Sequence, residues 1–256
     1  MREIHEVALA IKSVSKRFGD LLVLDEVSLT VEDQEFLCLV GPSGCGKTSL
    51  LRLVANLEPL SGGQIVLNGK QVQEMGAGIG FVFQEYGLFP WRTVKSNIEF
   101  GLEIKGVDKV ARDGIVQRYL DLVGLTGFED YYPKHLSGGM KQRVALAREL
   151  AHGPQIILMD EPFAALDALT RNAMQSELLR IWEAMRKTVL FVTHNVDEAV
   201  FLADRIAVMS RRPSRIIKVI HITLPRPRGR TSPEVNRIRN LILSLLAEET
   251  EMAPGA

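Results

Sequence analysis

The sequence of 256 residues has few cysteines, no excess charge of either sign and no long apolar run. Its two cysteines, Cys38 and Cys45, are seven positions apart, which suits reduced thiols better than a disulfide framework. No apolar run approaches the ~18 residues that a membrane-spanning helix requires. The first residues lack the basic and then apolar regions of a secretory signal. We therefore expect the protein to stay in the cytosol.

The balance of charge also excludes one class of partner. Lys+Arg and Asp+Glu each number 31, so the formal net charge is zero. Nothing in the bulk charge favours nucleic acid, and any basic surface must be local. The apolar fraction of 46% is ordinary for a globular protein, and the length suffices for one large domain or two lobes.

What the sequence does contain is a phosphate-binding pattern at residues 41–48. This stretch fits G-x-x-x-x-G-K-[ST] and follows the apolar run 36–40. Its glycines let backbone N–H groups point inward, and a helix starting near Lys47 adds the positive end of its dipole. Lys47 is expected on the β- and γ-phosphates and the Thr48 hydroxyl on Mg²⁺. The alternative, a glycine-rich turn without a ligand, leaves this agreement unexplained. The predicted nucleotide-binding residues are Gly41, Pro42, Ser43, Gly44, Cys45, Gly46, Lys47, Thr48 and Ser49.

The order of apolar segments predicts an α/β fold. Residues 7–40 alternate short apolar runs with turns, as strands do, and further strands are expected near 61–70 and 79–83. From residue 137, helical segments alternate with apolar runs, which predicts a mostly parallel sheet. The expected strands here are 156–159, 189–192 and 206–209, and the expected helices run to about 151 and from 170 to 186.

We predict three parts. The core is 1–84 with 137–210, and 85–136 is a helical subdomain with helices around 94–104 and 110–123. The third part, 211–256, is a basic, proline-broken segment that reads most simply as a solvated linker, followed by a last helix from Ser232. One face of that helix is apolar and is expected to pack on its own core or on a partner. Its residues are Val235, Ile238, Ile242 and Leu245.

Several polar residues follow the expected core strands, where open α/β sheets bind ligands. Asp160 ends one strand and is expected to orient Mg²⁺, while Glu161 is expected to polarise the attacking water. His194 follows another strand and is a candidate contact to a γ-phosphate, although a lone histidine is more often a packing or surface residue. Gln84 ends a third strand and can reach Mg²⁺ or water at the start of the helical part.

Two further features suggest ligand contacts. The Phe18 ring stands alone in a polar stretch, so it either stacks on a base or packs against its turn. Ser137 is a good helix N-cap, but Gly138 and Gly139 weaken a helix start by about 1 kcal/mol each. That cost suggests a close approach, and the N–H groups there form a second anion site. One nucleotide does not need two such sites, so this one is expected to face the nucleotide of a second copy.

All these motifs occur in the order found in ATP-binding cassettes. Over about residues 7–210 the chain resembles the nucleotide-binding subunit of ABC transporters. The resemblance implies a P-loop NTPase fold with an antiparallel β subdomain and an inserted helical subdomain. It identifies Phe18 as the adenine-stacking aromatic, Gln84 as the Q-loop, Ser137, Gly138 and Gly139 as the signature, Asp160 and Glu161 as the Walker B aspartate and catalytic glutamate, Asp167 as the D-loop and His194 as the switch histidine.

The resemblance also implies cofactors and partners. Two ATP molecules with Mg²⁺ would lie between the Walker A loop of one copy and the signature of the other in a head-to-tail homodimer. The surface from Gln84 to Trp91 would contact two membrane permease subunits, served by a periplasmic or lipid-anchored solute-binding protein. The subunit would then be a peripheral protein on the cytoplasmic side of a bacterial inner membrane.

Shorter stretches indicate a subgroup of ABC transporters, and two residues depart from the family motifs. The stretches 86–91, 136–143 and 221–228 are similar to importers of nitrate, sulfonates and taurine. Met140 stands where the signature commonly has glutamine, and Ala164 stands where the D-loop commonly has a small hydroxyl residue. The rival is a soluble ABC ATPase without a transport role, but no heptad run separates Lys47 from Leu136. A nucleotide kinase or GTPase would lack the site at Ser137.

Overall fold

The computed structural model describes residues 6–74 and 78–251, which belong to two compact units. The first unit comprises Met1–Ala77 and Lys187–Ala256, and the second is Gly78–Arg186. The prediction that the chain begins without a secretory signal concerns its first residues, and residues 1–5 lie outside the described part of the chain. Strands and helices mix in both units, which confirms the predicted α/β class. The three-part division with boundaries at 84, 136 and 210 stays a prediction.

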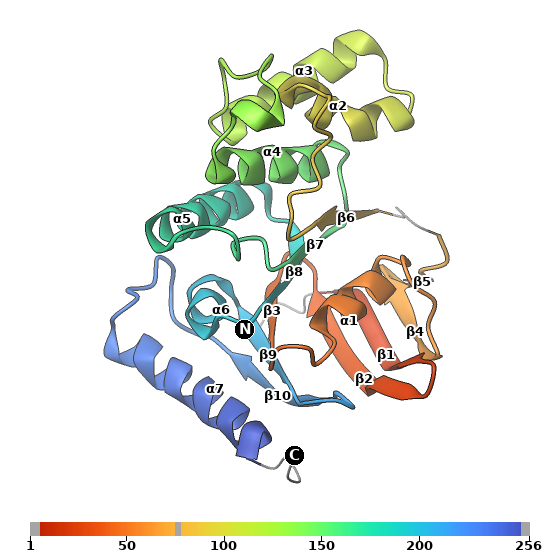
Figure 1. Ribbon diagram of the computed structural model, residues 1–256, viewed down its shortest axis with the longest axis vertical. Coiled ribbons are helices and arrows are strands. Elements are labelled where there is room, and N and C mark those ends of the chain that lie inside the picture. The colour runs from red at the N-terminus through yellow and green to blue at the C-terminus, as the bar shows by residue number, and fades with distance from the viewer. Residues whose placement is uncertain (1–5, 75–77, 252–256) are drawn as a thin grey trace. The chain divides into compact units, whose positions relative to one another are not determined.

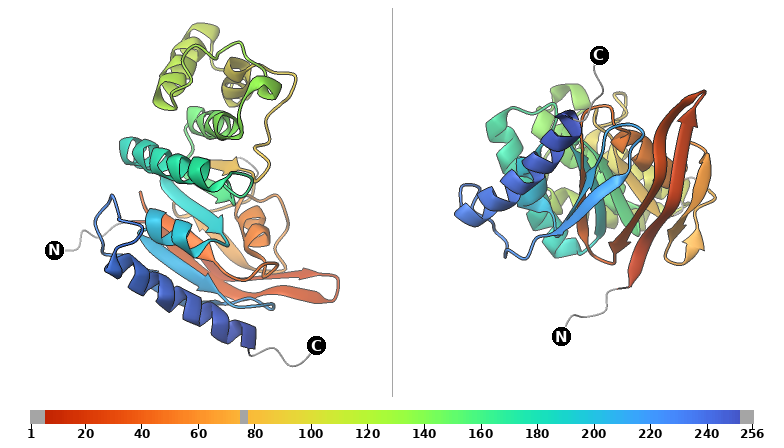
Figure 2. Two further views of the ribbon diagram at one scale, coloured as in Figure 1. Left: turned by 60° about the vertical axis from the view of Figure 1, so that its left-hand side comes forward. Right: turned by 90° about the horizontal axis from the view of Figure 1, so that it is seen from below.

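The first unit begins with an antiparallel sheet in the strand order β2-β1-β4-β5, seen edge-on at the right of Figure 2. The apolar runs within residues 21–31 lie in one strand, β2, which pairs with β1. Register shifts between β1 and β2 let both strands continue past polar positions. The strands are β1 (Val7–Phe18), β2 (Leu21–Glu32), β4 (Gly62–Leu67) and β5 (Lys70–Gln71).

A second group of strands in this unit is mostly parallel. Strand β3 (Phe36–Val40) lies between β8 (Thr188–Thr193) and β9 (Arg205–Met209), and both pairings are parallel. Every residue of β3 and β8 is buried, as expected for a continuous apolar run in a parallel sheet. Helix α1 (Lys47–Val54) follows β3, and helix α6 (Val196–Leu202) follows β8 (Figure 1).

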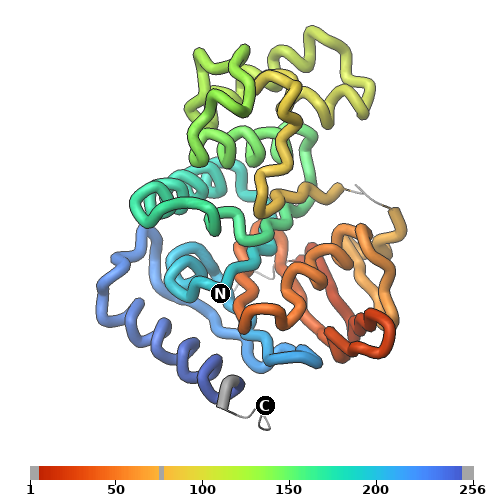
Figure 3. The backbone as a smooth tube through the Cα atoms, viewed as in Figure 1, coloured from red at the N-terminus to blue at the C-terminus, as the bar shows by residue number. Residues whose placement is uncertain are grey.

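The second unit pairs β6 (Ile79–Val82) in parallel with β7 (Ile156–Asp160) and adds a helical group. Thr93, Asp108, Ser137 and Asp167 each cap a helix by accepting N–H bonds in its first turn. Figure 3 shows the segment after β6 passing α4 before α2 begins. The helices are α2 (Val94–Ile104), α3 (Lys109–Leu122), the 3₁₀ turn η1 (Pro133–His135), α4 (Gly138–Ala151) and α5 (Ala168–Met185).

The interpretation of the basic segment after residue 210 as a solvated linker is wrong. Strand β10 (Ile216–His221) pairs antiparallel with β9 and extends the sheet. Arg228 is buried, and its guanidinium donates to the carbonyl oxygens of Val200, Phe201 and Ala203 at the end of α6. The carbonyl end of a helix attracts cations, which explains why the Arg228 guanidinium is held there. The segment around Arg228 is therefore packed on the core and is not solvated.

The predicted last helix, α7 (Pro233–Glu251), packs on its own core. It contacts α6 and β9, and Figure 2 shows it running beside α6. Val235 and Ile242 of the predicted apolar face are buried. Across residues 6–74 and 78–251, no helix combines the length and apolarity needed to cross a bilayer.

Replacing Arg228 by alanine should destabilise the protein by about 2 to 4 kcal/mol, because three carbonyl groups at the end of α6 lose their donor. Burial lowers the pKa of the Arg228 guanidinium to about 10, so it is still charged at neutral pH. Urea unfolding followed by circular dichroism measures the change. Arg237→Ala, at an exposed position of α7, is the matched control and should stay within about 0.5 kcal/mol of wild type. Equal losses in both variants would contradict the assigned contact.

Candidate nucleotide-binding site

The loop of residues 41–46 leaves β3 and leads directly into α1. Lys47 turns back over this loop and is buried, with 5% of its surface exposed. Its ammonium donates to the carbonyl oxygens of Gly41 at 2.8 Å and Pro42 at 3.0 Å. The Cys45 N–H donates to the same Pro42 carbonyl at 3.3 Å and tightens the turn. A buried cation therefore sits against the loop, at the position expected for binding polyphosphate.

Gly46 makes the end of the loop possible. Its φ of 114° is one that glycine adopts without strain. A Cβ there would lie 2.8 Å from Val23 Cγ1 and 2.9 Å from Leu24 Cδ2, both on β2. The N-cap of α1 is Gly46, which has no side chain to cap the helix, and an N-terminus without a side-chain cap favours an anion. The backbone of this loop thus has the donors that the sequence pattern predicts.

The strand register brings His194 to the same edge of the sheet as this loop. Val40 of β3 pairs with Thr193 of β8, so Gly41 and His194 follow paired residues of parallel strands. The Thr193 hydroxyl donates to Glu198 at 2.7 Å and accepts the Asn195 N–H at 3.0 Å. These bonds fix the backbone on either side of His194. His194 thus follows a core strand, as expected, and its contact to a γ-phosphate stays a prediction.

The second unit repeats this arrangement with the predicted metal and catalytic groups. Val82 of β6 pairs with Met159 of β7, so Gln84 and the pair Asp160 and Glu161 emerge at one strand edge. Asp160 is buried, whereas Gln84 is exposed. Glu161 has a φ of 45°, a conformation that is uncommon for a residue with a side chain and that clusters at functional sites. Its roles, and those of Gln84 and Asp160, stay predictions.

The helix start at Ser137 has the predicted cap, but its glycines have a cause inside the chain. The Ser137 hydroxyl accepts the Met140 N–H at 3.3 Å and is exposed at the start of α4. A Cβ on Gly138 would lie 3.0 Å from a methyl group of Leu166 and 3.2 Å from the Tyr86 hydroxyl. Close packing within the second unit therefore favours a glycine at this position. A Cβ on Gly139 would make only ordinary contacts with Thr170 and Met174, and the expected role of both glycines toward a second copy stays a prediction.

Two other predicted residues are exposed. Asp167 caps α5 and accepts the N–H groups of Leu169 and Thr170 at 3.1 and 3.0 Å. The Thr170 N–H and the other donors hold the pKa of the Asp167 carboxyl below its usual range. Phe18 ends β1 with 46% of its surface exposed and has the Lys16 ammonium 4.6 Å from its ring centre. Neither observation tests base stacking or a D-loop role, so both stay predictions.

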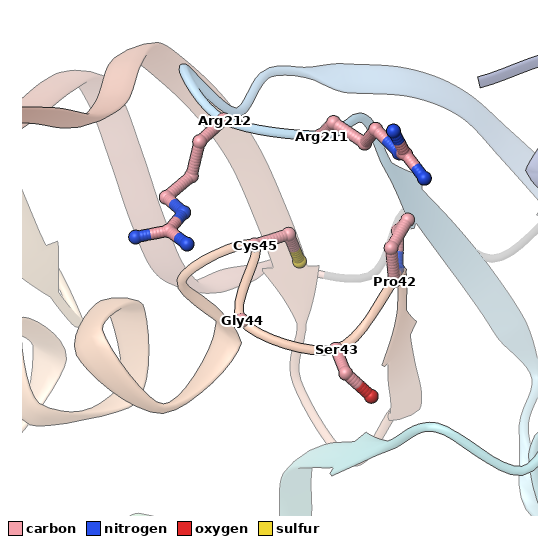
Figure 4. A pocket seen from close by; sticks show the side chains of 6 residues that line it. All are labelled: Pro42, Ser43, Gly44, Cys45, Arg211 and Arg212. Carbon is pink, nitrogen blue, oxygen red and sulfur yellow. The ribbon is translucent and has the colours of Figure 1, made fainter. Parts of the chain in front are cut away.

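Sequence reasoning missed two arginines beside the phosphate loop. Arg211 and Arg212, on the turn between β9 and β10, line a cavity of about 480 Å³ together with residues 42–45 (Figure 4). The prolines and charge of this segment are typical of a linker, which hid its place at the site. Its only sequence signal is the clustering of Arg211, Arg212 and Arg215 directly after a predicted core strand.

Comparison with known proteins identifies the family. The ABC transporter family model matches residues 24–164, more than half of the chain. The chain belongs to the ABC transporter family. An uncharacterized ABC transporter ATP-binding protein of Methanocaldococcus jannaschii is 52% identical over 97% of this chain and 94% of its own length. An aliphatic sulfonates import ATP-binding protein of Bacillus cereus is 45% identical over 94% of this chain and 93% of its own.

A solved structure agrees with this family. It is an ATP-binding cassette in a dimeric post-hydrolysis state bound to ADP and Pi, with a TM-score of 0.72 and 30% identity. The match covers 86% of this chain and 99% of the cassette. The predicted resemblance, fold class and ATPase activity are confirmed: this ABC protein is an ATP-hydrolysing subunit that binds ATP.

The two thiols of this ABC ATPase should react slowly in the native state. Cys38 and Cys45 are free and buried, and burial raises the pKa of both thiols, with Lys47 opposing the rise only at Cys45. At pH 7 we expect N-ethylmaleimide to add to neither thiol within minutes and to both in 6 M guanidinium, a difference of about 100-fold or more in rate. Intact-mass spectrometry counts the adducts. Rapid native labelling of Cys45 would contradict its burial.

Proposed function

We propose that this ABC ATPase drives the import of small anionic solutes, with sulfonates the first candidates. The observation that supports the solute class is the 45% identity to an aliphatic sulfonates import ATP-binding protein over nearly the whole of both chains. The similarity of residues 86–91, 136–143 and 221–228 to the nitrate, sulfonate and taurine group points the same way. An ATP-binding subunit does not bind the cargo, so permease and solute-binding partners set the choice among these anions.

In this proposal the ATP phosphates lie in the loop 41–48, with Lys47 on the β- and γ-phosphates and Ser49 behind them. The buried Lys47 ammonium against the loop and the glycine N-cap of α1 support this placement. Mg²⁺ would be held by Thr48, Asp160 and Gln84, which supply the hydroxyl, carboxylate and amide oxygens that this hard cation prefers. Phe18 would stack on the adenine. The metal supplies charge neutralisation between the phosphates when bound.

Hydrolysis is assigned to Glu161 and His194. A carboxylate at the end of β7 can orient and polarise water for attack on the γ-phosphate, and a histidine at the end of β8 can contact the developing charge. The strained backbone of Glu161 and the hydrogen-bonded turn around His194 are the features expected of positioned catalytic groups. Both side chains follow core strands, so their positions are set by sheet register rather than by mobile loops.

We further propose that two copies close around two ATP molecules. The exposed N-terminus of α4, with Ser137, Gly138 and Gly139, would bind the γ-phosphate held by the other copy, and Asp167 would lie at the same junction. The dimeric state of the related cassette supports this arrangement. Each added N–H to phosphate bond is worth roughly 1.5–3 kcal/mol, so ATP stabilises the closed dimer and hydrolysis lets it open.

The partner in the membrane would bind the segment from Gln84 to Trp91. Trp91 is 71% exposed, and its ring lies 5.7 Å from that of Phe89. Asn97 is fully buried and holds the end of this segment. It donates to the carbonyl groups of Phe89, Arg92 and Thr93 and accepts the Phe89 N–H. A large exposed aromatic on a rigid base is typical of an interface hot spot. The subunit would thus be peripheral, on the cytoplasmic side of the inner membrane.

Glu161→Gln should retain ATP binding but cut turnover about 10³-fold or more, equivalent to about 4 kcal/mol of barrier. The amide keeps the shape of the side chain and loses its ability to polarise water. Phosphate release measures turnover, and size-exclusion chromatography with ATP should show a trapped dimer. Glu183→Gln on the exposed side of α5 is the control. Near-normal turnover of Glu161→Gln would refute the assignment.

Deletion of the gene should abolish growth with an alkanesulfonate as the only sulfur source if the import proposal is correct. Complementation with wild type should restore growth, whereas Trp91→Ala should restore it at most weakly while keeping the ATPase rate of the isolated subunit within about twofold. Leu243→Ala, another exposed apolar position, is the matched control and should complement fully. If the deletion strain grows fully on alkanesulfonates but fails with taurine as the only sulfur source or nitrate as the only nitrogen source, the proposed substrate changes and the class of small anionic solutes stands.

A further inference from the structure

The turn between β9 and β10 is fixed against the phosphate loop. The Ser214 hydroxyl donates to the Cys45 carbonyl, and Ser214 is completely buried. Its N–H donates to Val23 at 2.9 Å, and its carbonyl accepts the Asp25 N–H at 3.0 Å. The turn is also closed on itself, because Ser210 and Arg215 exchange two bonds of 2.9 Å. Side chains on this turn therefore project from a backbone that is held in place beside the loop.

Three arginines project from this turn, and their pairing differs. Arg215 forms an ion pair with Asp25. Within residues 6–74 and 78–251, the guanidinium groups of Arg211 and Arg212 have neither an ion pair nor a hydrogen bond. A guanidinium is always charged and presents planar donors that match phosphate oxygens. Two such groups are thus available at the turn.

Both free guanidinium groups border the loop. They line the cavity of about 480 Å³ whose other walls are Pro42, Ser43, Gly44 and Cys45. Figure 4 shows Arg212 reaching toward Gly44 and Cys45 and Arg211 reaching over Pro42, whereas the Ser43 side chain points away from both. A Cβ built on Gly44 would be 3.6 Å from Arg212 Nη2, so this arginine already lies over the loop backbone. The lining contains no carboxylate.

We propose that Arg212, assisted by Arg211, is an additional nucleotide-binding residue that contacts the polyphosphate of ATP from outside the phosphate loop. This inference rests on the proposed placement of ATP in residues 41–48. The loop offers N–H dipoles and one buried ammonium, and the turn adds two cations on long side chains and a fixed backbone. Such a side chain can move from its present position over Gly44 to a phosphate oxygen without moving the turn. The contact favours nucleotides with more phosphates, because the guanidinium groups interact with the negative charge of the phosphates and not with the base.

The test is the affinity of the full chain for fluorescent mant-ATP and mant-ADP, measured by titration at protein concentrations where sedimentation shows a monomer. We expect Arg212→Ala to weaken both by about 5- to 20-fold and the Arg211→Ala, Arg212→Ala double variant to weaken them further. The substitution should lower the affinity for mant-AMP less than the affinity for mant-ADP. Inorganic tripolyphosphate should displace mant-ATP less well from the Arg212→Ala variant than from wild type. Arg212→Lys should restore part of the affinity, because the charge returns without the planar donors.

The controls separate this inference from the proposed function. Arg237→Ala removes an equal charge from α7 and should bind like wild type. Lys47→Ala should lose binding whichever role Arg212 has. If wild type binds, Lys47→Ala fails and Arg212→Ala equals wild type, the inference is overturned while the ATP site stands. If wild type and Lys47→Ala bind equally, the placement of ATP itself is wrong. Unchanged circular dichroism and unfolding midpoints show that the variants fold.

Discussion

The parallel pairing of β3 with β8 is the constraint on which the phosphate site depends. Because the two strands run in one direction with Val40 beside Thr193, the chain leaves both at one edge of the sheet. The loop that starts at Gly41 and the residue His194 therefore begin at the same edge of the sheet. In the second unit, the parallel pairing of β6 with β7 likewise brings Gln84 and Asp160 to one strand edge. Two strand registers thus collect groups that are far apart in the sequence.

This rule also explains which parts of the site the sequence could predict. Residues directly after buried apolar runs are placed by strand direction alone, so the apolar pattern is enough to place His194, Gln84 and Asp160 at strand ends. The starts of α4 and α5 can also be predicted from the sequence, since Ser137 and Asp167 cap these helices through local hydrogen bonds. Each of these predictions needs only neighbours in sequence and one tertiary fact, the parallel sheet.

What could not be predicted depends on packing between distant segments. Prolines and arginines after residue 210 indicate solvent, yet β10 completes a sheet and Arg228 is buried among the carbonyl groups of α6. The Arg228 guanidinium donates to backbone oxygens, which every residue type carries. No acidic side chain in the sequence therefore indicates that this arginine is buried. Gly138 shows how a second cause can hide behind a sequence signal. Its cost at a helix start suggests a ligand, and Leu166 and Tyr86 also lie close to where its Cβ would be.

Helix α4 connects two segments of the second unit that are predicted to be functional, the one at Gln84 and the one at Ser137. Glu149, near its C-terminus, accepts the Phe81 N–H of β6 at 3.1 Å, and its neighbour Arg148 donates to the Tyr86 and Gly87 carbonyls. Gln84 therefore lies between two points that are anchored on one turn of α4. The N-terminus of the same helix carries Ser137, roughly 16 Å away at 1.5 Å per residue. A continuous hydrogen-bonded helix resists stretching and bending, so a displacement of the Gln84 segment moves the Ser137 end as well.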